Sequence, residues 1–385
     1  MDRPRLPRPR TVVECFEGLP DPRLDRTRVH KLTDILVIGL CSMLTIGEGF
    51  TDMEFLGRAQ EKWLKTFLEL PNGIPSHDTF NRVFSAIDPQ CFLECFVQWA
   101  QGVCAAIKGE VVAIDGKALR RAADSGEPLP CIVSAWASEN GLALGQIKVD
   151  DKSNEITAIP ELLNVLALKG CIVTIDAIGC QKQIAGMIAD KGADYVLALK
   201  GNQEAALGEF RQYFDYALSP QNGGSLPERK AKPGTMSFFK NAEKGHGRLD
   251  VRRYWHTTDI HWFADRKLWK GLQSVGMVES ERTVGETRSI ERRYYLSSLP
   301  LGAETFARAV RGHWSVENSL HWSLDVTFRE DQSRARTRYA AQNLATLRRL
   351  ALNLVKKDKT RKLPLRQKRM LAAMNHDYLK HLLGV

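Results

Sequence analysis

The chain has 385 residues, of which 43% are hydrophobic and 26% charged, a composition that excludes a mostly disordered chain, a collagen and a coiled coil. The formal net charge is +10, and all of it comes from two short stretches. Residues 1–10 hold four arginines against one aspartate, and residues 356–369 hold eight bases against one aspartate. Such stretches favour a polyanionic partner, most often a nucleic acid, although solubilising segments have the same composition.

The longest apolar run, residues 35–46, is too short to cross a membrane, which takes roughly 20 residues, and it therefore predicts a buried helix. The eight cysteines are scattered, and none forms a Cys-x-x-Cys pair. The arginine-rich N-terminus is not followed by the apolar stretch of a secretory signal. We therefore expect reduced thiols and a cytoplasmic protein.

Residues 11–105 have the apolar spacing of helices. A turn at residues 71–75 is followed by Ser76, which stands where the N-cap of a short helix belongs. The polar side chains of this helix, Arg82 among them, are predicted to face outward. This pattern is compatible with a helix-turn-helix that contacts DNA, and equally with a plain helical hairpin, which is the commoner structure.

From Glu110 onward the pattern changes to strands that alternate with helices. Asn140-Gly141 lies between two apolar runs and predicts a hairpin. The predicted order of strand, strand, strand, helix, strand, helix and strand indicates a mixed α/β sheet. Three further charged strands predict an inserted β subdomain, and two helices follow it. The predicted strands are residues 111–115, 132–137, 142–149, 171–176, 195–199, 251–257, 274–278 and 288–297, and the predicted helices are 157–168, 181–191, 304–326 and 338–357.

Two of these strands end in an acid, Asp115 and Asp176. Carboxylates at strand ends lie at one edge of a sheet, where they can converge from distant positions in the chain. Paired acids suit Mg²⁺, which takes oxygen ligands, and two such ions about 4 Å apart can support phosphoryl transfer. The alternative is that both aspartates only cap strands before turns.

A second polar cluster lies between residues 311 and 322, where His313, Glu317 and His321 are four residues apart and share one helix face. Trp314 and Trp322 flank that face. Three interpretations are open. The cluster could bind zinc, although its spacing is not that of zinc proteases. It could be a solvated polar face beside buried tryptophans, or Glu317 could complete a site with the two aspartates.

Several long motifs occur in order between about residues 20 and 355, and with them the chain resembles the H-repeat-associated branch of the bacterial insertion-sequence DDE transposases. The motifs are Pro75-Ser-His-Asp-Thr-Phe80, Val112-Ala-Ile-Asp-Gly-Lys117, Lys152-Ser-Asn-Glu-Ile-Thr-Ala-Ile-Pro-Glu-Leu-Leu163, Thr174-Ile-Asp-Ala-Ile-Gly-Cys-Gln181, Lys200-Gly-Asn-Gln203, Gly245-His-Gly-Arg248 and His313-Trp-Ser-Val-Glu-Asn-Ser-Leu-His-Trp-Ser-Leu-Asp-Val326.

The resemblance implies a ribonuclease H-like catalytic domain with an inserted β subdomain, preceded by an all-helical N-terminal domain. It implies that Asp115, Asp176 and Glu317 bind two Mg²⁺ ions, with Mn²⁺ as a substitute and no organic cofactor. The expected partners are double-stranded DNA, both transposon ends and target, and a second copy of the chain in an active homodimer. Should Glu317 lie elsewhere, Asp325, Glu330 and Asp331 are the substitutes for the third acid. The predicted DNA contacts are Lys117, Lys200, Arg311, His313, Trp314, His321, Arg82 and the basic C-terminal tail.

The predicted domains follow the changes in pattern along the chain. They are a helical DNA-binding domain at 1–105, a first catalytic part at 106–204, a β-rich insertion at 205–302, a second, helical catalytic part at 303–355 and a basic tail at 356–385. Aligned on Glu317, the chain has Val310, His313 and Leu324 where the larger cut-and-paste group has Tyr, Arg and Lys. A DNA hairpin intermediate is therefore left open.

The resemblance predicts a reaction in which water cuts at the transposon end and the released 3′-hydroxyl attacks target DNA. Two rival functions remain. A related metal nuclease would cut DNA without joining it. A silent DNA-binding regulator descended from a transposase would be expected to have lost an acid, and all three are present.

Overall fold

The computed structural model describes residues 11–104, 108–119, 129–149, 155–219, 235–245 and 247–385. The basic stretch at residues 1–10 lies outside the described residues. The chain forms two compact units. Unit 1 comprises Met1–Ala106, Gly116–Leu166 and Val316–Val385, and unit 2 comprises Ile107–Asp115 and Ala167–Ser315. No described helix is long and apolar enough to cross a membrane.

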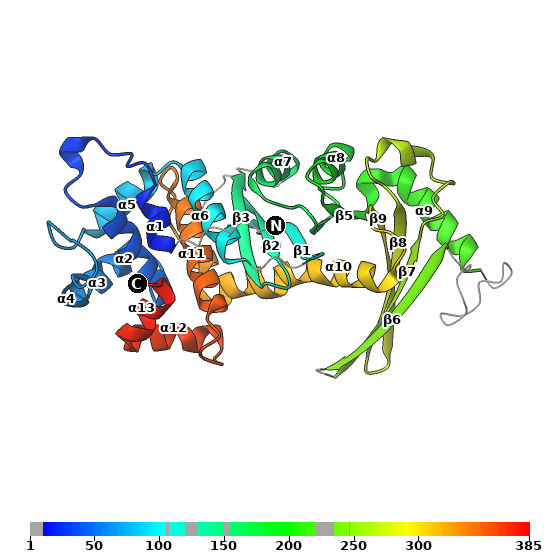
Figure 1. The fold of residues 1–385 in the computed structure, drawn as a ribbon. Coiled ribbons are helices and arrows are strands. Elements are labelled where there is room, and N and C mark those ends of the chain that lie inside the picture. Colours follow the sequence, from blue (N-terminus) through cyan, green and yellow to red (C-terminus); the bar gives the residue numbers. More distant parts are fainter. Residues whose placement is uncertain (1–10, 105–107, 120–128, 150–154, 220–234, 246) are drawn as a thin grey trace, which may run out of the picture. The chain divides into compact units, whose positions relative to one another are not determined.

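The described residues of unit 1 up to Val103 are mostly helical, as the apolar spacing predicts (Figure 1). Within α2 the predicted buried helix is confirmed, because all but one of its residues are buried. Ser76 caps α5 by accepting a hydrogen bond from the Thr79 amide at 3.3 Å. The helices are α1 (Val12–Glu17), α2 (Leu32–Leu44), α3 (Phe50–Ala59), α4 (Glu61–Leu64), α5 (His77–Ala86) and α6 (Pro89–Val103).

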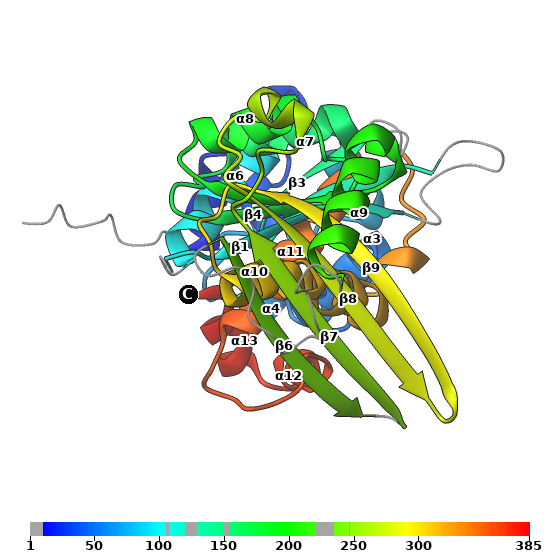
Figure 2. The ribbon, with the colours of Figure 1, turned by 90° about the vertical axis from the view of Figure 1, so that its right-hand side faces the viewer.

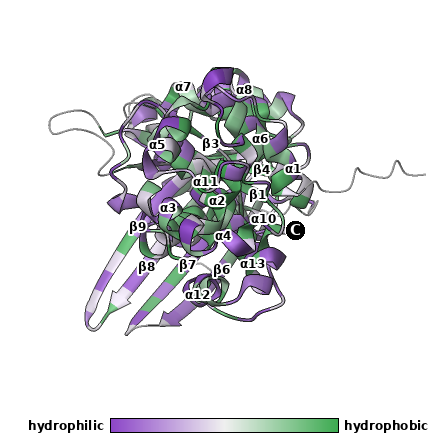
Figure 3. Ribbon diagram, turned by 90° about the vertical axis from the view of Figure 1, so that its left-hand side faces the viewer, coloured by the Kyte–Doolittle hydropathy of each residue, from purple (hydrophilic) through white to green (hydrophobic). Residues whose placement is uncertain are grey.

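The remainder of unit 1 is built around α11 (Ala340–Lys357), which contacts α2, α5, α6 and the strand β3. Two asparagines of α11 bond to buried main chain. Asn353 accepts from the Ala143 amide at 2.9 Å, and Asn343 donates to the carbonyls of Phe84 and Ile87. Figure 3 shows hydrophobic residues gathered along α2 and α11. The other elements are β2 (Cys131–Ala137), β3 (Leu142–Val149), α7 (Glu155–Val165), α12 (Leu365–Met374) and α13 (His376–Leu383).

The segment predicted as a basic C-terminal tail contains two helices. Helices α12 and α13 pack in unit 1, and two of the eight bases of residues 356–369 are buried. Lys368 donates to the Val355 carbonyl at 3.1 Å, and Arg369 donates to the Met43 carbonyl at 3.1 Å. Five bases of the segment remain exposed, namely Lys357, Lys359, Arg361, Lys362 and Arg366.

Unit 2 contains a sheet in the order β1-β4-β5-β9-β8-β7-β6, in which β1, β4 and β5 are parallel and β9 joins β5 in antiparallel pairing. Figure 2 shows β6 to β9 side by side. The inserted strands thus extend the sheet of β1, β4 and β5. Of the four, β6 is absent from the predicted strands. The strands are β1 (Val111–Ala118, with its last three residues in unit 1), β4 (Ile172–Ile175), β5 (Asp194–Leu199), β6 (Met236–Gly245), β7 (Arg248–Thr257), β8 (Ser274–Val284) and β9 (Thr287–Ser297).

In unit 1, β3 pairs with β2, and β2 is the neighbour of the end of β1. An antiparallel hairpin that leads into parallel strands is the arrangement expected of a ribonuclease H-like domain. The predicted mixed α/β class, with a helical N-terminal region ahead of the sheet, is therefore confirmed.

One helix of unit 2, α10 (Ala303–Ser315), lies against the sheet and contacts β4 to β7 (Figure 1). Phe306 anchors it in a core cluster that also contains Val111, Tyr254 and Tyr295. Gly276 permits this contact, because a Cβ there would lie 2.3 Å from the Phe306 ring. The other helices of unit 2 are α8 (Lys182–Asp190) and α9 (Glu204–Ala217). Beyond Ser315 the chain continues in unit 1 as wider π-helical turns at Val316–His321 and Ser323–Thr327.

Candidate active site

Asp115 and Asp176 stand side by side, each directly after the last paired residue of two parallel strands. Asp176 follows the end of β4, whereas Asp115 lies within β1, which continues to Ala118 beyond the predicted strand end at residue 115. In the register of β1 and β4, Ile114 faces Ile175, and each aspartate is the next residue of its strand. Neighbouring strands lie about 4.8 Å apart, so the two carboxylates share one edge of the sheet. Asp176 Oδ1 also accepts a hydrogen bond from the Ile178 amide at 3.0 Å, which holds the turn that follows. Both side chains are half-buried.

Both aspartates lie on the sheet face that α10 covers. Side chains alternate along a strand, so Asp176 points to the same side as Thr174. The Thr174 hydroxyl is 3.1 Å from Nδ1 of His313 on α10. In the same way, Asp115 shares its side with Val111, whose side chain meets α10 at Gly312. Both aspartates therefore face α10, the helix that carries the predicted site residue His313.

His313 is a neutral imidazole at pH 7. Burial lowers its pKa to about 4, against the opposing effect of the Asp176 carboxylate, while Lys200 and Arg293 lower it further. His313 therefore adds no positive charge beside Asp176, and the carboxylates keep their attraction for cations. The zinc interpretation gains no support, because His313 is engaged with Thr174. Within the described residues, no three acidic, histidine or cysteine side chains form a group that could hold a metal ion.

The remaining predicted residues of this helical stretch lie in unit 1. Glu317 is exposed on the first π-helical turn, His321 is half-buried, and Trp322 is 57% exposed. Because Glu317 and the two aspartates belong to different units, their convergence stays a prediction. Two carboxylates at one sheet edge nevertheless form a donor set that fits Mg²⁺, which is commonly held by one or two carboxylates, several waters and substrate phosphates.

Lys200 and Trp314 are in unit 2 with the aspartates. Lys200 directly follows β5 and is exposed. The Trp314 ring lies beneath the guanidinium of Arg293, 4.9 Å from the ring centroid. The sequence analysis did not identify Arg293, because β9 carries many charged residues and only the strand register shows which of them faces α10.

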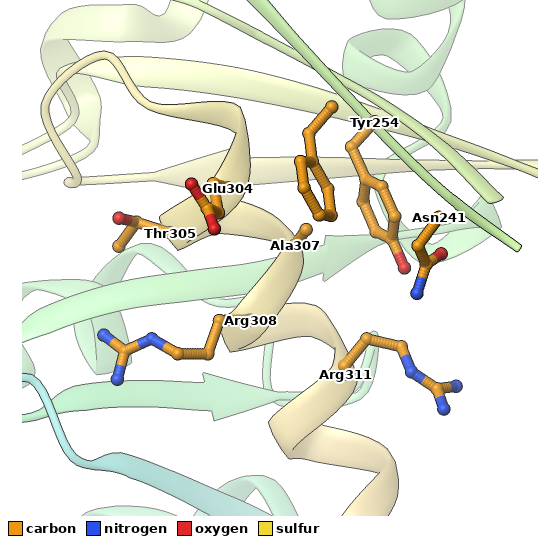
Figure 4. Close-up of a pocket in the computed structure, with 8 residues that line it drawn as sticks. Asn241, Tyr254, Glu304, Thr305, Ala307, Arg308 and Arg311 are labelled. Atoms are coloured by element: carbon orange, nitrogen blue, oxygen red, sulfur yellow. The ribbon is translucent and has the colours of Figure 1, made fainter.

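Arg311 has a different environment from the one predicted for a DNA contact. It extends from α10 toward β6, where it pairs with Glu243 at 3.2 Å. Figure 4 shows it at one end of a pocket of about 420 Å³ beside Asn241 and Tyr254. The Arg308 side chain leaves the same helix in another direction. Arg311 is therefore neutralised within the protein.

Lys117 also differs from its prediction as a phosphate contact. Its side chain is 8% exposed, and its ammonium lies 2.8 Å from Asp325, 2.9 Å from Asp331 and 3.4 Å from Glu330. Glu330 pairs in turn with the buried Arg349 at 2.9 Å. These five side chains are called the Lys117 network below. The acids considered as substitutes for Glu317 thus surround a buried lysine of unit 1.

The predicted DNA-reading face on α5 is exposed at His77, Asp78 and Arg82. Arg82 bonds within its own helix, to the Asp78 carbonyl and the Thr79 hydroxyl. His77 joins α5 to α3 through Glu54, at 2.8 Å. A pocket of about 410 Å³ lies beside His77 and is also lined by the loop after the π-helical turns. That loop carries three exposed arginines that the sequence analysis did not identify, Arg334, Arg336 and Arg338.

Comparison with known proteins decides the family. Residues 108–354 match the family model "Transposase DDE domain", and residues 13–100 match "DDE_Tnp_1-associated". The chain belongs to the DDE transposases. It is 39% identical over 380 residues to the "H repeat-associated putative transposase YhhI" of Escherichia coli K12, a match that covers 97% of each chain. It is equally similar to the "Putative transposase YncI" of E. coli O157:H7, over 97% of this chain and 94% of that protein.

These matches confirm the H-repeat-associated branch and identify the chain as a DNA transposase of an insertion sequence. Among solved structures, the fold is similar to the piggyBac transposase synaptic complex with hairpin DNA, with a TM-score of 0.43 and 11% identity. That alignment covers 97% of this chain and 77% of the other. The family assignment depends on the sequence matches.

Proposed function

We propose that this transposase cuts DNA at the ends of its insertion sequence and joins the freed 3′-hydroxyl to target DNA, with Asp115, Asp176 and Glu317 as its catalytic acids. The observation that carries the proposal is the register of β1 and β4, which makes Asp115 and Asp176 neighbours at one sheet edge. Glu317 enters because it follows α10, four residues after His313, in the matched family domain.

The proposed cofactor is Mg²⁺, bound as two ions and replaceable by Mn²⁺. When bound, the ions would activate the attacking oxygen and neutralise charge on the phosphate. The residues of the chain hold the carboxylates in place: paired strands fix their Cα atoms, and the turn bond to Ile178 orients Asp176. Neutral His313 keeps the neighbouring charge negative.

Double-stranded DNA is the proposed substrate, bound by exposed cations of both units and by α5. The two ends of an element must be processed together, so we propose a homodimer as the working assembly, in the cytoplasm. Size-exclusion chromatography with light scattering, run with and without end DNA, tests this part. A complex of a single chain with a single DNA end, and no larger species, would contradict it.

The decisive experiment supplies the protein with Mg²⁺, a labelled duplex of the sequence that flanks its gene, and a target plasmid. The expected products are a new 3′-hydroxyl at the element boundary and a joined strand in the plasmid. Cleavage without joining would support the metal nuclease instead. Specific binding without cleavage, in Mg²⁺ and in Mn²⁺, would support the silent regulator.

A further inference from the structure

Two cations are neighbours at the end of the β5–β9 ladder. The last pair in this antiparallel register is Leu199 with Tyr294, so the next residue of β5 is Lys200 and the preceding residue of β9 is Arg293. Both side chains lie on the face that α10 covers. Two residues away on each strand, and therefore on the same face, Ala198 and Tyr295 lie opposite each other and pack in the core cluster of Phe306.

Arg293 is held in a defined orientation. Its guanidinium lies over Trp314, and Glu291, two residues away on the same strand, accepts from it at 2.8 and 3.1 Å. Trp314 follows His313, which bonds to Thr174 two residues before Asp176. The half-buried Arg293 is therefore held against the end of α10 that contacts β4, and its planar guanidinium group has a fixed orientation.

The neighbouring residue of β9 makes different contacts. Arg292 points to the opposite face of the sheet, where it pairs with Glu279 at 2.8 Å and Asp215 at 2.9 Å. Arg292 and Arg293 thus have the same chemistry and adjacent positions, and only Arg293 faces α10.

Two cations placed side by side repel each other, and an anion between them relieves that repulsion. Glu291 offsets part of the charge of Arg293, and it is itself exposed. The charges of Lys200, Arg293 and Asp176 all act on the half-buried His313, so the two cations and the Asp176 carboxylate lie in one neighbourhood. A guanidinium binds phosphate through two parallel hydrogen bonds, whereas a lysine adds a point charge.

We propose that Arg293, assisted by Lys200 and oriented by Trp314, binds a backbone phosphate of the DNA strand that lies against Asp115 and Asp176. This inference deepens the proposed function and rests on it for the identity of the anion. It assigns Trp314 a positioning role: the ring supports the guanidinium and need not touch DNA.

The test compares Arg293→Ala with Arg292→Ala as the matched control and Arg293→Lys as the conservative variant. Affinity for the gene-flanking duplex is measured in Ca²⁺ over a range of salt concentrations, which gives a readout that does not need activity. Single-turnover cleavage is then measured in Mg²⁺. Thermal unfolding of each variant shows that it is folded.

With Arg293→Ala, the slope of log K against log salt should become shallower by about 0.9, the value of one phosphate contact. Cleavage should fall by roughly 100-fold, the size of the effect when one charge-stabilising donor is removed. Arg293→Lys should restore the slope and recover only part of the cleavage rate. Arg292→Ala should match the wild type in both measurements.

Equal losses in Arg292→Ala and Arg293→Ala would overturn the inference, because they would show a general effect of surface charge. Wild-type behaviour of Arg293→Ala would overturn it as well, while leaving the proposed function intact. If the wild-type protein binds the duplex but does not cleave it, the proposed function fails and the salt slope still decides on the phosphate contact. Absence of DNA binding by the wild type would overturn both.

Discussion

Gly312 on α10 lies directly against Val111 on β1: a Cβ added to Gly312 would be 2.7 Å from Val111 Cγ1. The next residue after this contact is His313, whose bond to Thr174 ties the helix to β4. The absence of a side chain at one position therefore sets how closely α10 approaches the strands that end in Asp115 and Asp176.

Gly312→Ala should lower the free energy of unfolding by about 1–3 kcal/mol, the usual cost of overpacking, although alanine favours helix. It should also reduce DNA cleavage, because α10 must move away from β1. Chemical denaturation and cleavage assays measure the two effects. Val111→Ala in the same chain should restore much of both. Gly208→Ala on α9, where a Cβ would meet nothing within 4 Å, is the control and should be neutral or stabilising. Failure of the double variant to recover would contradict the steric explanation.

Asp115→Asn and Asp176→Asn should each reduce Mg²⁺-dependent cleavage by more than about 100-fold, above the loss caused by removing an outer-shell partner of a metal ligand. Affinity for end DNA in Ca²⁺ should change little, because amide and carboxylate have the same shape. Asp190→Asn, at a surface ion pair with Lys270, is the control and should retain activity. Cleavage that persists in Asp115→Asn and requires Zn²⁺ would favour the helical His313 cluster instead.

Lys117→Met should lower the free energy of unfolding by about 3–5 kcal/mol, because three carboxylates of the Lys117 network would lose their central cation. The salt dependence of DNA binding should not change. Lys65→Met breaks an exposed helix pair with Glu61 and should cost at most about 0.5 kcal/mol. A shallower salt slope with unaltered stability would show that Lys117 contacts phosphate after all.

Because of His256, we expect the free energy of unfolding to fall in mild acid. The ring is fully buried against Phe306, its Nδ1 accepts a hydrogen bond from the Gly302 amide at 3.1 Å, and burial lowers its pKa to about 4. Between pH 6.5 and 4 the unfolded chain binds a proton that the folded chain does not, so stability falls as pH falls, by on the order of 3 kcal/mol. Denaturation at several pH values measures this slope. It should flatten in His256→Gln and persist in His261→Gln, a change of an exposed histidine in the same unit.

Removal of the five exposed bases of the C-terminal segment should weaken binding to all DNA sequences about equally. Each base that contacts a phosphate contributes about 0.9 to the slope of log K against log salt. Replacing all five by alanine should therefore make this slope shallower by several units. Preference for the element end should survive. Truncation after Val355 is a poorer experiment, because it removes the buried contacts of Lys368 and Arg369 and should destabilise unit 1. Loss of end preference in the five-fold variant would show that this segment reads sequence.

The sequence by itself determined the features that depend on local pattern. A twelve-residue run that is apolar apart from Gly39, Ser42 and Thr45 has to be buried, which predicted α2, and Asn140-Gly141 predicted the β2–β3 hairpin. Apolar runs followed by an acid predicted that Asp115 and Asp176 lie close together, although β1 continues past Asp115 to Ala118. In each case the deciding residues are neighbours in the chain, so composition and periodicity carry the information.

Only the tertiary structure decided which distant groups meet. Lys117 has the sequence context of an exposed lysine beside a predicted catalytic acid, and its partners Asp325 and Asp331 lie more than 200 residues away. Arg293 is one of several charged residues on β9, and only the register with β5 shows that it lies beside Lys200 on the face that α10 covers. The basic C-terminal segment was predicted as a tail because its charge outweighs its apolar pattern. Burial of Arg369 depends on the Met43 carbonyl of a helix more than 300 residues away, which no local pattern contains.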